Sequence, residues 1–376
     1  MLRYLQLLSL IALLPLGYTA SAVAEREILI GQSAAFTGNN SNMGLLVNRM
    51  IDAYFSMVNQ QGGIYGRPIR LLSLDDRYDP GQALANTQKL IDEKQVLALF
   101  AYIGTATANA AIPLVNKAKI AFVAPITGAG SMRRPYNPYI FNIRDSYASE
   151  AEKIAETIAR AGIKRVSILY QDDAYGQSGL RAMQQAAPQY GLSVSSTATV
   201  ARSSAQITAA VDNLIDDAKA IFVAATYKSA AAFIVAARQQ GYYGTFYGLS
   251  FVNAQGLLNE LGELAAGVRV AQVMPSLDET HLPIINEYYQ VLRHAGLPRA
   301  GYISLEAFIA AKVLVEGLRR AGKEVSRDKL LLALKSMAHY DLGGFRLNWG
   351  QGTQSGTRLV NMLMIADGQG TLMADD

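Results

Sequence analysis

The sequence predicts an α/β protein of two doubly wound parallel sheets, each forming one lobe, with a hinge between them. Short apolar strands alternate with helices of about 10 to 15 residues, which is typical of βαβ units. This alternation runs once through residues 28–145 and starts again over 146–274. The chain has 376 residues, which is long enough for two domains of about 150 residues each.

A targeting segment is expected at the start of the chain. Arg3 gives a positive charge, and residues 5–16 are mostly apolar. Small residues then recur at the spacing that signal peptidase recognises, so we expect a signal peptide over 1–24 that is cleaved near Ala22 or Ala24. The apolar stretch is shorter than the about 20 residues of a membrane helix, and the sequence has no cysteine for a lipid anchor. We therefore expect the mature chain to be free in the compartment beyond the inner membrane.

The first run of elements begins with a buried strand at 27–33 and a helix at 44–61. The helix carries apolar residues at helical spacing, and Gly62 and Gly63 end it. The other elements expected in this run are strands at 69–74, 96–101 and 120–124, and helices at 79–94 and 106–117.

The second run repeats the pattern. Its expected strands lie at 165–170, 193–199, 220–224 and 246–249, and its expected helices at 148–161, 175–190, 206–216 and 229–240. Long helices at 282–295 and 302–321, a shorter one at 327–337 and a strand at 359–366 are expected to follow. Ligands of doubly wound sheets bind outside the carboxyl ends of the strands, so the segments that follow the strands are the candidate site.

The composition argues against several classes of function. Lys and Arg number 34 and Asp and Glu number 30, and the cations are scattered without interleaved aromatics, so no nucleic-acid partner is expected. His281, His294 and His339 lie outside the strand-end segments, and no thiolate exists to complete a zinc site. The motifs of α/β-hydrolases and P-loop enzymes are missing. We therefore expect no catalytic residue, no metal and no cofactor.

Several segments together carry a family resemblance. The chain resembles the periplasmic solute-binding proteins of ABC importers, of the branched-chain amino acid (leucine/isoleucine/valine) binding type, with a type I periplasmic binding protein fold. The resemblance runs from about residue 27 to the end, and the segment VNQQGGIYGRPIRLLSLDDRYDP is its most specific part. The segments are GQSAAFTG (31–38), VNQQGGIYGRPIRLLSLDDRYDP (58–80), GTATANAAIP (104–113), APITGAGSMR (124–133), YQDDAYGQSGL (170–180), ARQQGYYGTFYG (237–248) and AGYISLEAF (300–308).

This resemblance implies a division of the chain and a set of partners. Lobe one is expected over 27–145 plus 275–356, and lobe two over 146–274 plus 357–376. The crossings between them are expected near Arg144, Pro275 and Thr357. A monomer is implied, with a small-molecule ligand in the cleft and an inner-membrane ABC permease or another transport component as its partner.

The resemblance also bears on the ligand. Family members that bind α-amino acids hold the carboxylate at a helix start that corresponds to Thr105. They hold the ammonium with a hydroxyl and an acid at positions that correspond here to Gly128 and Ser250. No acid lies between Tyr227 and Asn259, and an unpaired buried ammonium costs several kcal/mol. We therefore expect a neutral, apolar or lipid-like ligand, such as a sterol, or an aromatic or organic acid, rather than a standard amino acid.

Two alternatives stay open. The first alternative is a branched-chain amino acid binding component of an ABC importer. The second is a sensory or lipid-shuttling binder for a chemoreceptor or a non-ABC exporter. The further positions expected to line the cleft are apolar, aromatic or hydroxyl-bearing, which suits such ligands. They are Met43, Tyr102, Ile126, Thr127, Tyr175, Thr226, Tyr227, Phe251 and Tyr302.

Overall fold

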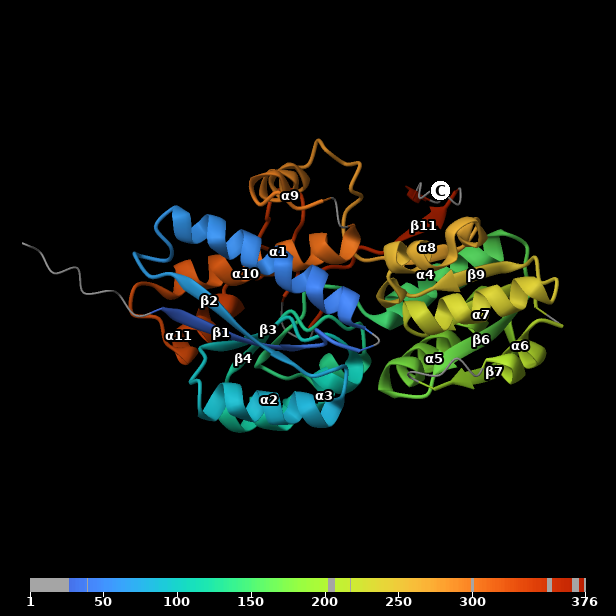
Figure 1. The fold of residues 1–376 in the computed structure, drawn as a ribbon, viewed down its shortest axis with the longest axis horizontal. Helices are drawn as coiled ribbons and strands as arrows, with labels where there is room; N and C mark the ends of the chain where they lie inside the picture. The colour runs from blue at the N-terminus through green and yellow to red at the C-terminus, as the bar shows by residue number, and fades with distance from the viewer. Residues whose placement is uncertain are drawn as a thin grey trace, which may run out of the picture.

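The predicted α/β class with two separate sheets is confirmed (Figure 1). The structure is a computed structural model, and it describes residues 27–38, 40–201, 207–216, 218–298, 301–349 and 354–366, together with the backbone of 372–374. The signal peptide predicted over 1–24 lies outside the described residues, so its cleavage site stays a prediction.

A five-stranded sheet in the order β2-β1-β3-β4-β5 forms the centre of the first lobe, and all its pairings are parallel. Its strands are β1 (Ile28–Ala34), β2 (Ile69–Asp75), β3 (Ala98–Phe100), β4 (Ala121–Val123) and β5 (Ile140–Phe141). Figure 1 shows helices above and below this sheet, and two buried clusters fill the two interfaces. The helices are α1 (Ser41–Gln60) and α10 (Tyr302–Ala321) on one face, α2 (Pro80–Asp92) and α3 (Thr105–Ala118) on the other, and α9 (Pro283–His294) and α11 (Arg327–Lys335) beside α10.

A seven-stranded sheet in the order β12-β11-β10-β9-β8-β6-β7 forms the centre of the second lobe. Its strands are β6 (Arg165–Gln171), β7 (Ser193–Val200), β8 (Ala220–Ala224), β9 (Thr245–Gly248), β10 (Arg269–Gln272), β11 (Asn361–Ile365) and β12 (Leu372–Ala374). The first five are parallel, whereas β11 runs antiparallel to β10 and to β12. The helices on its faces are α4 (Tyr147–Arg160) and α5 (Ala174–Ala186), and α6 (Thr208–Leu214), α7 (Tyr227–Gln239) and α8 (Ala254–Leu261).

The sequence analysis did not expect four of these elements. They are β5, α8, β10 and β12. The three strands have two to four residues each, so no alternating period can develop in them, and α8 has only eight residues, fewer than the window in which a helical period is read. Partners across the sheet, rather than local propensity, make these short strands.

The helices that the structure describes give no sign of a membrane span. The longest, α1 and α10, have 20 residues each. Neither these nor any other helix within the described ranges is both long and apolar enough to cross a bilayer.

The chain passes between the two sheets three times: after β5, after β10 and before β11. The first and third passages lie side by side. The indole of Trp349 donates a hydrogen bond of 2.6 Å to the carbonyl of Asn142. Arg133 donates to the backbone carbonyls of Arg144 and Asp145 at 2.8 and 3.0 Å, and to Oγ of Ser355 at 3.1 Å. The predicted lobe boundaries at 145/146, 274/275 and 356/357 remain predictions at the level of single residues.

Candidate ligand-binding site

The carboxyl ends of the strands of the two sheets face each other, and helices from both lobes touch there. Figure 1 shows α3 of the first lobe beside α5 of the second. Farther along the same junction, the side chain of Tyr227 in α7 is hydrogen-bonded to that of Asn42 in α1. The two lobes are thus closed on each other, and the side chains between them are almost fully buried.

The start of α3 forms the first part of this site. Gly104 precedes the helix with a φ of +102°, and a Cβ there would lie 2.4 Å from the ring of Tyr78, so only glycine fits. Thr105 is the first helical residue, and its Oγ1 lies 2.7 Å from Oγ1 of Thr127. The Thr107 hydroxyl instead donates to backbone carbonyls of the preceding turn. The first N–H groups of a helix have no partner within it, so this end is suited to an anion.

Three aromatic rings form the middle of the site. The Tyr175 ring centroid lies 5.4 Å from that of Tyr147 and 4.8 Å from that of Phe251. Tyr147 also explains the glycine at 128, because a Cβ on Gly128 would lie 2.4 Å from Cδ1 of the tyrosine. The Thr127 hydroxyl donates to Oη of Tyr147 at 3.4 Å, so the rings adjoin the start of α3.

A buried cluster of charged groups forms the third part. Ser250 donates from its backbone N to Oε2 of Glu150 at 2.7 Å and from its hydroxyl to Oε1 at 3.0 Å. Arg144 donates from Nη2 to Oγ of Ser250 at 2.7 Å, and its Nε lies 3.1 Å from Oε1 of Glu306. Each of these four residues is at most 4% exposed. Because Glu150 reaches Ser250 from the first turn of α4, the expectation of a cleft without an acid is wrong.

Burial controls the protonation of this cluster. It raises the pKa of Glu150 to about 7, although Arg144 and the hydrogen bonds from Ser250 act in the opposite direction. Burial likewise raises the pKa of Glu306 against the attraction of Arg144. Burial opposes the charge of Arg144, but Glu306 and Glu150 together raise its pKa above the ordinary value. The guanidinium is therefore charged at neutral pH, whereas Glu150 titrates there.

Comparison with known proteins decides the family. A model of the periplasmic binding protein family matches residues 27–369. The chain belongs to the periplasmic binding protein family.

Solved structures and a curated relative agree with this family. A possible leucine/isoleucine/valine-binding protein from Rhodopirellula baltica SH 1 is 27% identical, with a TM-score of 0.89 over 95% of this chain and 98% of its own. A fatty acid ABC transporter substrate-binding protein from Thermomonospora curvata is 23% identical, with a TM-score of 0.83 over 94% and 92%. The amino acid binding protein of Pseudomonas aeruginosa is 24% identical over 165 residues, which is 43% of each chain. The predicted type I periplasmic binding protein fold is confirmed by the first of these similarities.

Not all of the predicted lining residues of this binding protein meet at the cleft. The side chain of Tyr102 packs on Phe122 with centroids 5.0 Å apart, and its hydroxyl lies 3.1 Å from that of Thr87 in α2. It therefore belongs to the core beneath the first sheet. Met43 and Ile126 belong to the large buried cluster that runs through both lobes and also contains the cleft rings.

The remaining predicted positions lie on the second lobe or at its border. The hydroxyl of Thr226 donates to Oε1 of Gln171 at 3.1 Å, just before α7 begins. Tyr302 starts α10 and packs against the core clusters of both lobes. It shares a small pocket with Ser250 and Asn253. The binding protein thus places Tyr302 where the lobes meet.

The sequence analysis missed the residues that carry charge in the cleft. Arg144 was expected only as a crossing point, and Glu150, Tyr147 and Glu306 were not expected in the site. A signal was present for both acids. Glu150 lies on the buried stripe of α4, and Glu306 lies within the apolar run of α10, where an unpaired carboxylate is rarely buried.

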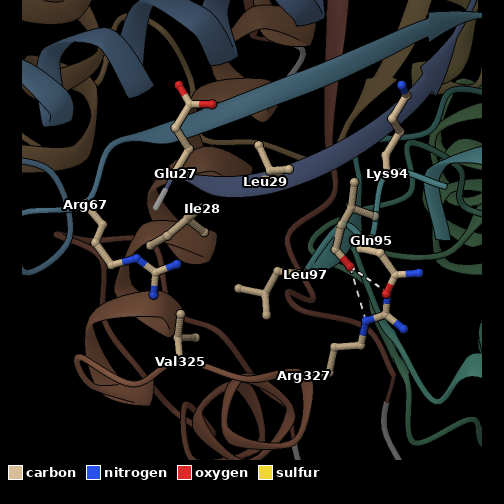
Figure 2. A pocket seen from close by; sticks show the side chains of 10 residues that line it. Glu27, Ile28, Leu29, Arg67, Lys94, Gln95, Leu97, Val325 and Arg327 are labelled. Carbon is tan, nitrogen blue, oxygen red and sulfur yellow. Dashed lines mark hydrogen bonds between the residues drawn. The ribbon is translucent and has the colours of Figure 1, made fainter. Parts of the chain in front are cut away.

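A separate hollow of about 650 Å³ lies at the opposite end of the first sheet. Ile28 and Leu29 at the amino end of β1 line it together with Leu97, and Figure 2 shows Arg67 and Arg327 on opposite sides. Arg327 donates from Nε and Nη2 to the carbonyl of Val96. Because the predicted ligand site is at the carboxyl ends of the strands, this hollow is not part of the cleft.

Proposed function

We propose that this binding protein captures a small organic acid with an apolar or aromatic body between its lobes and delivers it to an inner-membrane ABC permease. The observation that carries the proposal is the start of α3, where the hydroxyls of Thr105 and Thr127 adjoin the first N–H groups of the helix, which have no partner within the helix itself. The aromatic rings next to this anion-binding end supply an apolar wall for the body of the ligand.

The relatives support an acid as the ligand class. Their descriptions refer to amino acids in two cases and to fatty acids in the third. These compounds differ in their apolar bodies but share a carboxylate. We therefore propose that the ligand of this chain also has a carboxylate, and that the start of α3 holds it.

We further propose that the ligand leaves unchanged and that the protein works in the periplasm. Within the described ranges, no three His, Cys, Asp or Glu side chains come together as metal ligands would. Closure of two lobes about a hinge is how a receptor presents its cargo to a transporter.

A standard amino acid is the second candidate, and one observation favours it. Glu150 places a carboxylate beside Ser250, at the position that corresponds to the ammonium-binding acid of amino acid binders. An ammonium bound there would face this carboxylate, although it would also approach the charged Arg144. The choice between the two ligands rests on the chemistry of this cluster.

The test of the acid-binding end is the Thr105→Val variant. The variant keeps the shape of the side chain and removes the hydroxyl, so the affinity for the acid should fall about tenfold, or about 1.4 kcal/mol. The ligand is identified by mass spectrometry of protein purified without refolding, and dissociation constants are measured by calorimetry. Thr157→Val is the matched control, because Thr157 also loses a hydroxyl but lies on α4, where it bonds the carbonyl of Lys153. An unchanged dissociation constant in Thr105→Val would remove this hydroxyl from the site.

A further inference from the structure

We propose that Arg144 and Tyr175 form a second subsite, which hydrogen-bonds a neutral oxygen of the ligand, so that the ligand is an oxo or hydroxy carboxylic acid. The inference rests on the proposed function, because the acid end at α3 fixes one end of the ligand. It adds a second polar group to the proposed ligand. That group is an oxygen, where an amino acid has an ammonium.

Arg144 has a buried donor without a partner. The side chain is 1% exposed. Its Nη2 donates to Ser250, and its Nε forms an ion pair with Glu306 but no hydrogen bond with a described residue. Its Nη1 is buried, and no group among the described residues accepts a hydrogen bond from it. A buried donor left unpaired destabilises the folded protein by about 1–3 kcal/mol. An acceptor on the ligand would remove this cost at Nη1.

Tyr175 presents a second unpaired group beside the first. Its ring is fully buried between Tyr147 and Phe251. Its Oη is buried and has no hydrogen-bond partner in the part of the chain that the structure describes. Tyr175 and Arg144 are electrostatic neighbours. Arg144 contacts Ser250 and Tyr175 packs on the next residue, Phe251, so the two unpaired groups belong to neighbouring side chains in the closed cleft.

The charges around Arg144 select the kind of group that fits. Glu306 and Glu150 already surround the guanidinium with negative charge, so a second carboxylate of the ligand would face two acids. An ammonium has only hydrogen-bond donors, so it cannot accept a hydrogen bond from Nη1 of Arg144. A carbonyl or hydroxyl oxygen accepts from Nη1 and from Oη without adding charge.

The two subsites lie within reach of one small molecule. Thr127 connects the start of α3 to the Tyr147 hydroxyl at 3.4 Å, and the ring of Tyr147 contacts that of Tyr175. In the proposed arrangement a carboxylate lies at α3, an oxygen on a nearby carbon faces Arg144 and Tyr175, and the apolar body lies against the rings.

The experiment compares ligands that differ at one carbon. The isobutyl series is 4-methyl-2-oxopentanoate, 2-hydroxy-4-methylpentanoate, leucine and 4-methylpentanoate; the benzyl series is phenylpyruvate, phenyllactate, phenylalanine and 3-phenylpropanoate. In the series that fits the cleft, calorimetry should give the oxo or hydroxy acid at least about tenfold higher affinity than the amino acid. An amino acid that binds as well or better overturns the inference and leaves a binding protein for amino acids.

The Tyr175→Phe variant tests the subsite itself. It keeps the ring and removes Oη, so it should weaken binding of the oxo acid about fivefold and leave the plain acid unchanged. Tyr102→Phe is the matched control, because Tyr102 loses an equally buried hydroxyl in the lobe core. Equal losses for the oxo acid and the plain acid overturn the subsite. If no acid of either series binds, the acid-binding end and the inference both fall; if the plain acids bind and the oxygen adds nothing, only the inference falls.

Discussion

Protonation of Glu150 should set the stability of the closed cleft, and Glu150→Gln isolates its effect. The carboxylate is fully buried, and both its oxygens accept hydrogen bonds from Ser250. Glutamine keeps the size of the side chain and one acceptor oxygen, but it cannot ionise. The variant therefore resembles the protonated form of the wild-type residue at every pH.

The sign and size of the effect follow from the pKa of Glu150. The folded protein holds this proton up to a pKa of about 7, whereas the ordinary pKa of the acid is 4.5. Between these values the folded state binds more protons than the unfolded chain, so the free energy of unfolding falls as the pH rises. At about 1.36 kcal/mol for each pH unit, the loss is about 3 kcal/mol by pH 8.

The assay is urea unfolding of the wild type and of Glu150→Gln at pH 5 and at pH 8. The difference in the free energy of unfolding between the two proteins separates the effect of Glu150 from that of the other groups that titrate. It should shift in favour of the variant by about 2–3 kcal/mol between the two pH values. Glu156→Gln is the control, because Glu156 lies on the same helix but is 39% exposed. A constant difference for Glu150→Gln would show that Glu150 ionises equally in the folded and unfolded states.

Two further substitutions test the packing of the cleft and of the hinge. Gly128→Ser adds the hydroxyl that amino acid binders of the family carry, but its Cβ would approach the Tyr147 ring to 2.4 Å. It should lower the free energy of unfolding by about 1–3 kcal/mol and weaken ligand binding, as urea unfolding and calorimetry can check; unaltered stability would refute the contact with Tyr147. Arg133→Lys breaks the fork that holds the carbonyls of Arg144 and Asp145 and the Ser355 hydroxyl. It should favour the open form, seen as a larger radius of gyration in X-ray scattering without ligand; an unchanged radius would contradict a role for Arg133 in the hinge.

Most of the regular elements could be predicted because their signals are local. The helix expected at 302–321 is α10 (Tyr302–Ala321), and the strand expected at 220–224 is β8 (Ala220–Ala224). Both carry a long or wholly apolar pattern that needs no knowledge of neighbours. The strand expected at 359–366 is β11 (Asn361–Ile365), but β12 and the antiparallel pairing of β11 with β10 and β12 were not predictable in this way.

The site was predictable only in part, because its two ends depend on different kinds of information. Thr105 follows a strand and opens a helix, and such a position is visible in sequence order. The partner of Ser250 is 100 residues away in the chain, and no spacing rule connects the two. The expectation of a cleft without an acid failed for this reason, since it considered only the residues near Ser250 in sequence.

The sequence by itself determined the βαβ alternation, the family and the helix start at Thr105, because these depend on residues that are neighbours in the chain. Only the tertiary structure decided which charges meet in the cleft. Arg144, Glu150, Ser250 and Glu306 come from four separate segments, and their burial governs their protonation. The physical reason is that the low dielectric between the closed lobes couples charges over short distances in space, whatever their separation along the chain.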